Sequence, residues 1–281
     1  MENIKKVAIV GGVHGNELTG AYLVKKWQKN PEIFKKQSLD ISVFLGNPKA
    51  CEINRRYVDQ DLNRSFSKRV LEDHSLPEYE ANRAKVLKEL ISGHSFLIDL
   101  HTTTANMGMT LVLSKKDPYS ERVAAILAEK FDDIKILRWL SNDEGDFINT
   151  LTPHGFTIEA GPIPQGVLRA DIFQRCEEIV YETLKIISND INQYETKETV
   201  VYDIVKTVDY PRTAAGEIEA IIHPSLQDRD YKALNSGDPI FVTFDGKVIP
   251  YEGETFYPVF INEAAYYEKG IAFCLCEKNL I

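Results

Sequence analysis

His14 and Glu17 lie three residues apart, directly after a short apolar run that ends in two glycines. The apolar run, residues 7–10, is typical of a buried parallel strand, and the residues from 18 onwards have helical spacing. Two side chains with this spacing at a strand-to-helix junction can reach one metal ion. The alternative is a phosphate-binding glycine loop, but the segment lacks both a GxGxxG fingerprint and a Lys, Ser or Thr after its glycines.

His101 directly follows a second apolar run, residues 96–100. Because the carboxyl ends of parallel strands meet at one edge of a sheet, we expect His101 to lie beside His14 and Glu17. Two histidines and one carboxylate form the ligand set of a catalytic zinc site and leave a fourth position for water. Zinc suits this set best, although cobalt or manganese would also bind. Asp99 either orients a ligand or accepts hydrogen bonds from local backbone donors, and the sequence leaves both roles open.

Glu159 ends a further apolar run, residues 155–158, and is therefore expected at the same edge of the sheet. A carboxylate beside a metal site can take the proton of a water molecule and hand it to a leaving amine. On its own, this position would indicate a solvated loop carboxylate. Beside a His/Glu/His set it predicts metal-assisted amide hydrolysis. Surface or loop positions are predicted for the remaining histidines, His74, His94, His154 and His223.

A polar loop, residues 55–66, contains Arg56, Asn63 and Arg64. The guanidinium fork of arginine binds carboxylates through two parallel hydrogen bonds. The loop is therefore a candidate for holding an anionic substrate group near the metal site. The alternative is a charged loop that is simply solvated.

These residues must be positioned by strands and helices that alternate over the first two thirds of the chain. The predicted strands are residues 7–10, 41–45, 96–100, 110–113 and 155–158, and the predicted helices are residues 18–29, 77–91, 117–131 and 169–191. This alternation predicts an α/β fold in which helices flank a mainly parallel sheet.

The pattern changes near residue 192, after which strands and turns follow one another. The predicted strands are residues 199–208, 216–222, 239–243, 247–251, 257–261 and 271–276. Asp245 and Gly246 stand between two of these runs and predict a hairpin. We therefore expect an α/β catalytic domain at residues 1–192 and a smaller β-rich domain, capping the site, at residues 193–281.

The 281-residue chain has a formal net charge of −9, from 33 basic and 42 acidic residues. A chain this acidic is a poor partner for nucleic acid or for an anionic membrane. No apolar leader follows Met1, and no apolar run approaches ~18 residues, so we expect a cytoplasmic protein without a membrane span. Four cysteines without a CxxC pair indicate reduced thiols. The sequence leaves open whether the protein is a homo-oligomer.

The candidate residues lie in segments that resemble the aspartoacylase family, in the aspartoacylase/succinylglutamate desuccinylase group of the zinc carboxypeptidase-like fold. The matching segments are GGVHGNELTG (11–20), NRRYVDQDLNRSF (54–66), IDLHTTTANMG (98–108), IEAGPIPQGVLRADI (158–172) and YPVFINEAAYYEKGIAF (257–273). They follow the family order over nearly the whole chain. The resemblance implies a zinc-dependent hydrolase of small N-acylamino acids.

The resemblance also implies a role for each candidate. The ligands of one zinc ion per subunit would be His14, Glu17 and His101. Glu159 would act as general base and then as general acid. Arg56 would polarise the scissile acyl carbonyl, and the pair Asn63 and Arg64 would bind a substrate carboxylate. Tyr266 would reach the substrate from the second domain.

One position departs from the aspartate-specific members of the family, which carry an arginine upstream of the catalytic glutamate. By ungapped counting this position is Asn149, and an amide can hydrogen-bond a carboxylate but cannot neutralise it. Losing one charge-assisted contact costs about 1.5–3 kcal/mol, so we expect weaker or broader selectivity towards aspartate. Arg138 or Lys269 could supply the charge instead.

Four hypotheses follow. The first is hydrolysis of N-acetyl-L-aspartate to acetate and L-aspartate. The second is deacylation of other N-acylamino acids, aromatic or neutral. The third is peptide cleavage by a zinc carboxypeptidase, and the fourth is zinc-dependent binding without catalysis. The acidic chain and the extra β-rich domain favour small substrates, and Glu159 beside the metal set makes the fourth hypothesis the weakest.

Overall fold

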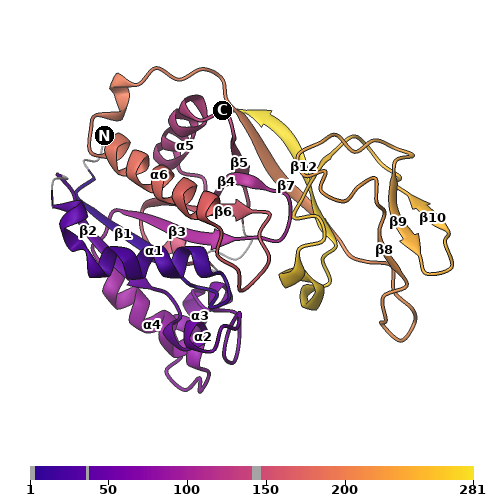
Figure 1. The fold of residues 1–281 in the computed structure, drawn as a ribbon, viewed down its shortest axis with the longest axis horizontal. Coiled ribbons are helices and arrows are strands. Elements are labelled where there is room, and N and C mark those ends of the chain that lie inside the picture. The colour runs from indigo at the N-terminus through magenta and orange to yellow at the C-terminus, as the bar shows by residue number, and fades with distance from the viewer. Residues whose placement is uncertain (1–3, 36–37, 141–146) are drawn as a thin grey trace.

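The computed structural model describes residues 4–35, 38–140 and 147–281, and within them a nine-stranded sheet runs through the protein (Figure 1). The strand order is β11-β12-β7-β5-β4-β6-β3-β1-β2. The strands of this sheet are β1 (Lys6–Gly11), β2 (Asp40–Leu45), β3 (Phe96–Thr102), β4 (Gly108–Leu113), β5 (Ile134–Arg138), β6 (His154–Gly161), β7 (Val200–Val208), β11 (Tyr257–Val259) and β12 (Phe273–Leu280).

The strand directions confirm a mainly parallel mixed sheet. β2, β1, β3 and β6 form one parallel block, and β4, β5 and β7 form another. The two blocks meet where β4 runs antiparallel to β6. β5 is not predicted from the sequence, because its five residues include Lys135 and Arg138 and so lack the apolar run of a central strand.

Helices cover both faces of the sheet. One face packs against α1 (Leu18–Lys29), α5 (Pro118–Lys130) and α6 (Ala170–Ile187), and the other packs against α4 (Tyr79–Ile91). Successive side chains of β1 point to opposite faces of the sheet. Val7 and Ile9 pack into the apolar core under α1, α5 and α6, whereas Ala8 and Val10 pack into the core under α4. Among the residues that the structure describes, no helix combines the length and the apolar character that crossing a bilayer requires.

Two helix ends differ from the predicted ones. α4 begins at Tyr79 rather than at Pro77, because Glu78 is extended, with φ −61° and ψ 137°. α6 ends at Ile187 rather than at residue 191, because Asp190 starts a separate turn by accepting a hydrogen bond from the backbone of Asn192. Two short helices, α2 (Pro48–Glu52) and α3 (Lys68–Glu72), lie in the segment before α4.

The C-terminal residues first extend the large sheet and then build a small one. β12 pairs antiparallel with both β7 and β11, so these strands continue the large sheet. β8 (Ala220–Ile222), β9 (Pro239–Thr243) and β10 (Val248–Pro250) form the three-stranded sheet that stands apart in Figure 1. The predicted hairpin joins β9 to β10, with Gly246 at φ +89° in its turn. A separate apolar cluster, which includes Tyr210 and Phe241, fills this region.

Candidate metal centre and active site

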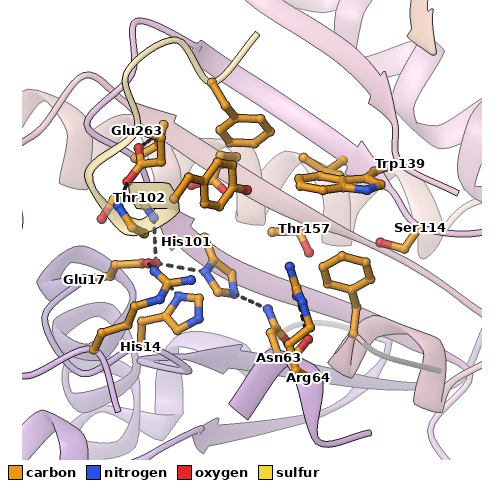
Figure 2. Close-up of a pocket in the computed structure, with 18 residues that line it drawn as sticks. His14, Glu17, Asn63, Arg64, His101, Thr102, Ser114, Trp139, Thr157 and Glu263 are labelled. Carbon is orange, nitrogen blue, oxygen red and sulfur yellow. Dashed lines mark hydrogen bonds and ion pairs between the residues drawn. The ribbon is translucent and has the colours of Figure 1, made fainter. Parts of the chain in front are cut away.

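β3 and β6 place two chemically active residues side by side. The strands are parallel and in register, with His101 paired with Glu159. β1 lies on the other side of β3 and ends at Gly11, just before the segment that contains His14 and Glu17. The ends of these strands open onto one pocket, as expected at the carboxyl edge of parallel strands (Figure 2).

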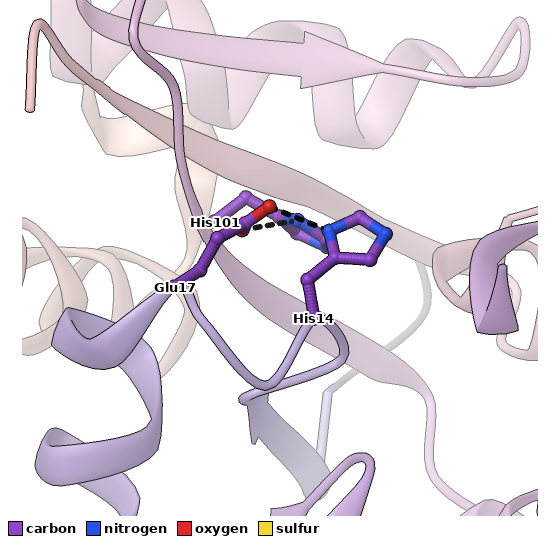
Figure 3. A group of neighbouring side chains, drawn as sticks. All are labelled: His14, Glu17 and His101. Carbon is purple, nitrogen blue, oxygen red and sulfur yellow. Dashed lines mark hydrogen bonds and ion pairs between the residues drawn. The ribbon is translucent and has the colours of Figure 1, made fainter. Parts of the chain in front are cut away.

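His14, Glu17 and His101 form one buried group in this pocket (Figure 3). One potential ligand atom of each residue lies within 4.8 Å of the others. Nδ1 of His14 is 2.6 Å from Oε1 of Glu17, and Nδ1 of His101 is 2.8 Å from Oε2 of Glu17. The structure therefore brings together the His/Glu/His set that the sequence predicts.

A carboxylate orients each imidazole from behind. Nε2 of His14 is 3.0 Å from Asp61, and Nε2 of His101 is 2.8 Å from Asp99. A ring nitrogen that donates its hydrogen to a carboxylate leaves the other nitrogen, here Nδ1, with its lone pair free for a metal. Asp99 thus orients a candidate ligand, which is one of the two roles that the sequence left open. Asp61 does the same for His14 and is not predicted from the sequence. Two imidazoles and a carboxylate with these partners form a ligand set that fits zinc.

Glu159 faces the same pocket from β6. Burial, reinforced by the negative charges of Glu17 and Glu263, raises the pKa of Glu159 well above its usual value. Its side chain lines the pocket, where the carboxylate can exchange a proton with a bound molecule. A carboxyl group with a raised pKa beside a metal set is suited to general acid–base chemistry.

The polar loop places its three candidate residues on the pocket wall. Arg56 donates to Oε1 of Glu17 over 3.3 Å and to Oδ2 of Asp61 over 3.1 Å. The guanidinium of Arg64 lies 4.9 Å above the ring of Phe147, and its Nη1 donates to the backbone carbonyl of Asn63 over 2.7 Å. Asn63 contacts His101, with its Nδ2 3.1 Å from Nε2.

Glu80 anchors this loop, although the sequence analysis does not single it out. The side chain lies at the start of α4 and is 0 % exposed. Its carboxylate accepts hydrogen bonds from the backbone N–H groups of Val58, Asp59 and Gln60, over 2.7, 3.0 and 3.2 Å. Asn47 Nδ2 donates to it as well, over 2.9 Å. These donors compensate the buried charge and fix the loop between Arg56 and Asn63.

Glu263 and Tyr266 reach the pocket from the C-terminal region. Glu263 accepts hydrogen bonds from the hydroxyl of Thr103 and from the backbone N–H of Thr104, the latter over 2.7 Å. It also accepts from the backbone N–H of Ala265 over 3.0 Å and so caps η5 (Ala264–Lys269), which carries Tyr266. Tyr266 therefore lines the pocket, as predicted, and Glu263 holds the short helix that carries it. The role of Glu263 is not predicted from the sequence.

Four aromatic rings line the pocket, and one of them, Phe147, lies against Arg64 of the loop. Trp139 lies 5.9 Å from Phe147, 5.7 Å from Phe260 and 6.1 Å from Tyr266, measured between ring centroids. The pocket has an empty volume of about 570 Å³ with its mouth included. Of these rings only Tyr266 is predicted from sequence, because isolated aromatic residues in separate loops carry no periodic signal.

Asn149 lies behind the pocket wall in η3 (Ile148–Leu151) and is 2 % exposed. Neither of the two cations considered as substitutes for a missing arginine lines the pocket. Arg138 forms ion pairs with Asp203 and with Glu121. Lys269 is exposed, and its Nζ is 3.7 Å from Glu268. Asn149, the position that ungapped counting assigns to the family arginine, therefore has no cation in its place from Arg138 or Lys269.

The other histidines and the cysteines lie outside this pocket. The predicted loop position is wrong for His154, which is the partly buried first residue of β6. His154 contacts Asp117 at the start of α5, over 2.9 Å. All four cysteines are free thiols; Cys176, Cys274 and Cys276 are buried, and Cys51 is partly exposed.

Comparison with known proteins agrees with this geometry. Residues 3–187 match the succinylglutamate desuccinylase/aspartoacylase catalytic domain, and residues 197–278 match the AstE/AspA barrel-sandwich hybrid domain. The β-rich C-terminal region thus has the fold of a barrel-sandwich hybrid domain.

Relatives of this chain carry two kinds of name. A probable aspartoacylase from Nostoc sp. is 45% identical over 290 residues, which cover 100% of this chain and 99% of the relative. The N-acyl-aromatic-L-amino acid amidohydrolase (carboxylate-forming) of Homo sapiens is 41% identical over 292 residues, which cover 99% and 92%. The crystal structure of murine aminoacylase 3 superposes with a TM-score of 0.95 at 37% identity and covers 100% of this chain and 97% of that chain.

Proposed function

The chain belongs to the succinylglutamate desuccinylase/aspartoacylase family, and on that premise we propose that it is a metal-dependent amidohydrolase that removes the acyl group from small N-acylamino acids. The observation that carries this proposal is the pairing of Glu159 with His101, which puts an acid–base group beside a His/Glu/His set. Binding without catalysis would need no such carboxylate.

We assign one zinc ion per subunit to His14, Glu17 and His101. When bound, zinc supplies Lewis acidity, which lowers the pKa of water and polarises a carbonyl oxygen. Glu159 would accept the proton of the attacking water and then deliver it to the nitrogen of the leaving amino acid. The raised pKa of Glu159 supports the first step, because a carboxylate with a higher pKa is a stronger base towards water.

The remaining site residues would bind and orient the substrate. Arg56, held by Glu17 and Asp61, is placed to stabilise charge that grows on the acyl oxygen. Arg64, with Asn63 beside it, would bind the α-carboxylate through its fork. Tyr266 would contact the substrate from residues 193–281, which we propose as a domain that caps the catalytic domain of residues 1–192.

Of the candidate substrates, we place aromatic and neutral N-acylamino acids ahead of N-acetyl-L-aspartate. Trp139, Phe147 and Phe260 form an apolar wall suited to a flat side chain. The only cations among the described lining residues are Arg56 and Arg64, so a second carboxylate would have no partner of its own. N-acetyl-L-aspartate remains the second candidate, since relatives named aspartoacylases match the whole chain.

A substrate panel tests this proposal. Hydrolysis of N-acetyl-L-phenylalanine, N-acetyl-L-tyrosine, N-acetyl-L-aspartate and unblocked dipeptides would be measured with zinc and with a chelator. We expect zinc-dependent release of acetate from the N-acetylamino acids and little cleavage of dipeptides. Far-ultraviolet circular dichroism should change little on chelation, because the apolar cores do not include the ligands. Turnover that survives chelation, or a preference for dipeptides, would contradict the proposal.

A further inference from the structure

Two hydroxyl groups lie on the pocket wall on the same side of His101 as Arg64 (Figure 2). They belong to Ser114, directly after β4, and to Thr157 in β6. Nδ2 of Asn149 donates to both, over 3.1 Å to Ser114 and 3.3 Å to Thr157. The amide thus holds the two hydroxyls from behind, outside the pocket.

The direction of these hydrogen bonds fixes what the hydroxyls offer. Because Ser114 and Thr157 accept from Asn149, each keeps its own hydrogen for another partner. Neither hydroxyl donates to an acceptor within the described ranges of the chain. Both side chains line the pocket, so the wall presents two O–H donors to a bound molecule.

The surrounding charges decide which acceptor suits these donors. Arg56 is engaged by Glu17 and Asp61, and Arg64 is assigned to the α-carboxylate. Glu159 and Glu263 add negative charge to the same pocket. A substrate carboxylate bound at Ser114 and Thr157 would lose its water shell without gaining a cation as a partner, which is costly. An uncharged substrate oxygen would only exchange hydrogen bonds with water for hydrogen bonds with the two hydroxyls.

The connection to Arg64 indicates which part of the substrate reaches this wall. Oδ1 of Asn63 accepts a hydrogen bond from the backbone N–H of Ile148 over 3.2 Å, which ties η3 to the residue beside Arg64. Asn149 is the next residue of η3. If Arg64 holds the α-carboxylate, the group nearest to Ser114 and Thr157 is the side chain of the same amino acid.

We propose that Ser114 and Thr157, positioned by Asn149, form a subsite for the end of the substrate side chain and select an uncharged oxygen acceptor. The substrate class is N-acylamino acids whose side chain ends in a phenol or a carboxamide. This inference rests on the proposed function, because it takes the pocket as the site of an N-acylamino acid. It goes beyond that function, because it predicts a preference for N-acetyl-L-tyrosine over N-acetyl-L-phenylalanine and for N-acetyl-L-asparagine over N-acetyl-L-aspartate.

Binding measurements test the subsite apart from the chemistry. Calorimetric titration of the zinc-loaded Glu159→Gln protein would compare N-acetyl-L-tyrosine with N-acetyl-L-phenylalanine, and N-acetyl-L-asparagine with N-acetyl-L-aspartate. We expect the first member of each pair to bind about tenfold more tightly. Adding Ser114→Ala and Thr157→Val should remove most of that preference, and Ser114→Ala alone should remove part of it. Thr183→Val, which deletes a buried hydroxyl in α6, is the matched control.

The outcomes separate this inference from the proposed function. Equal binding within both pairs, tighter binding of aspartate, or a preference that survives removal of both hydroxyls would overturn the subsite. The comparison within each pair needs neither hydroxyl variant, so poor folding of those variants does not prevent the test. The expected preference in Glu159→Gln, together with a zinc-loaded wild type that hydrolyses none of the four ligands, would keep the subsite and refute the amidohydrolase.

Discussion

Glu159 occupies the position in β6 that pairs with His101 in β3, so one ladder of backbone hydrogen bonds sets the distance between the proposed acid–base residue and a proposed metal ligand. Neighbouring strands are about 4.8 Å apart, which leaves both side chains at the same depth of the sheet edge. The two strands lie in the middle of the nine-stranded sheet and are covered on both faces. The spacing of these two residues is therefore set by the core of the sheet and not by a loop.

Replacing Glu159 by glutamine should abolish turnover and spare the metal. The amide has nearly the same shape as the carboxylate but cannot accept the proton of water, so kcat should fall at least about 10²-fold. Zinc content, measured on the purified protein, should match that of the wild type. Glu217→Gln, on an exposed turn, is the control. Near-normal turnover with full zinc occupancy would remove Glu159 from the mechanism.

Arg64→Ala and Arg56→Ala should have different kinetic effects. If Arg64 holds the α-carboxylate in both the ground state and the transition state, its loss should raise KM more than it lowers kcat. Arg56→Ala should mainly lower kcat, because charge grows on the acyl oxygen only as water attacks. Arg64→Lys keeps the charge without the fork and should be intermediate. Exchanged effects would mean that the roles assigned to the loop are wrong.

The sequence predicts the residues of this site that sit at the ends of strands. His101 and Glu159 each end an apolar run, and the rule that sites lie at the carboxyl edge brings them together. Glu80 and Glu263 escape prediction, because each acts by hydrogen bonds to backbone groups far away in sequence. Their importance depends on which loop lies beside them, and that is a property of the tertiary structure.

The fold, like the site, is only partly predictable from the sequence. Long apolar or alternating segments identify the sheet and its helices, but β5 has only five residues, two of them basic, and is missed. The sequence pattern also separates residues 193–281 as a β-rich region. It does not reveal that β7 pairs with β5 and so continues the large sheet, because strand partners are chosen by packing over long sequence distances.

Glu80→Gln should weaken catalysis through the loop. A glutamine side chain has one acceptor oxygen, and its amide hydrogens would face backbone donors that now bind the carboxylate. Each unsatisfied buried donor costs about 1–3 kcal/mol. We expect a higher KM, a lower kcat and weaker zinc binding, since the loop holds Arg56 and Asp61. Glu89→Gln, on the exposed face of the same helix, should change none of these. A lower Tm with normal kinetics would indicate a purely structural role.

Asp230→Asn should stabilise the protein at high pH and not at low pH. Burial raises the pKa of Asp230 to about 7, and its Oδ2 has no partner among the described residues. The raised pKa means that the wild type loses stability as pH rises from the unfolded pKa, near 4, through the folded pKa. The variant avoids this loss, so its advantage in the free energy of unfolding should grow by about 2–4 kcal/mol from pH 4 to pH 8.

Denaturant unfolding at several pH values measures this difference. The amide of the variant can still accept the hydrogen bond from the backbone N–H of Ile261, so native packing is retained. Asp245→Asn, on the exposed hairpin, should show no such pH dependence. An advantage that is constant with pH would show that Asp230 is already ionised in the folded protein.

Asn149→Arg should shift selectivity towards aspartate. Asn149 lies directly behind Ser114 and Thr157, so a guanidinium at this position would bring a charge and two directed donors to the side-chain end of the pocket. The ratio of kcat/KM for N-acetyl-L-aspartate over N-acetyl-L-tyrosine should rise about tenfold or more. A buried cation without a partner is costly, so Tm should fall in the free variant and recover on addition of L-aspartate.

The control for this variant is Asn192→Arg, which adds the same charge at an exposed position outside the pocket. Arg138 cannot take over the role while it is held by Asp203 and Glu121, and Lys269 is exposed and outside the pocket lining. The wild type should therefore discriminate against aspartate by itself. A wild type that already prefers N-acetyl-L-aspartate, together with an unchanged ratio in Asn149→Arg, would mean that another residue supplies the positive charge. Selectivity would then not be set at position 149.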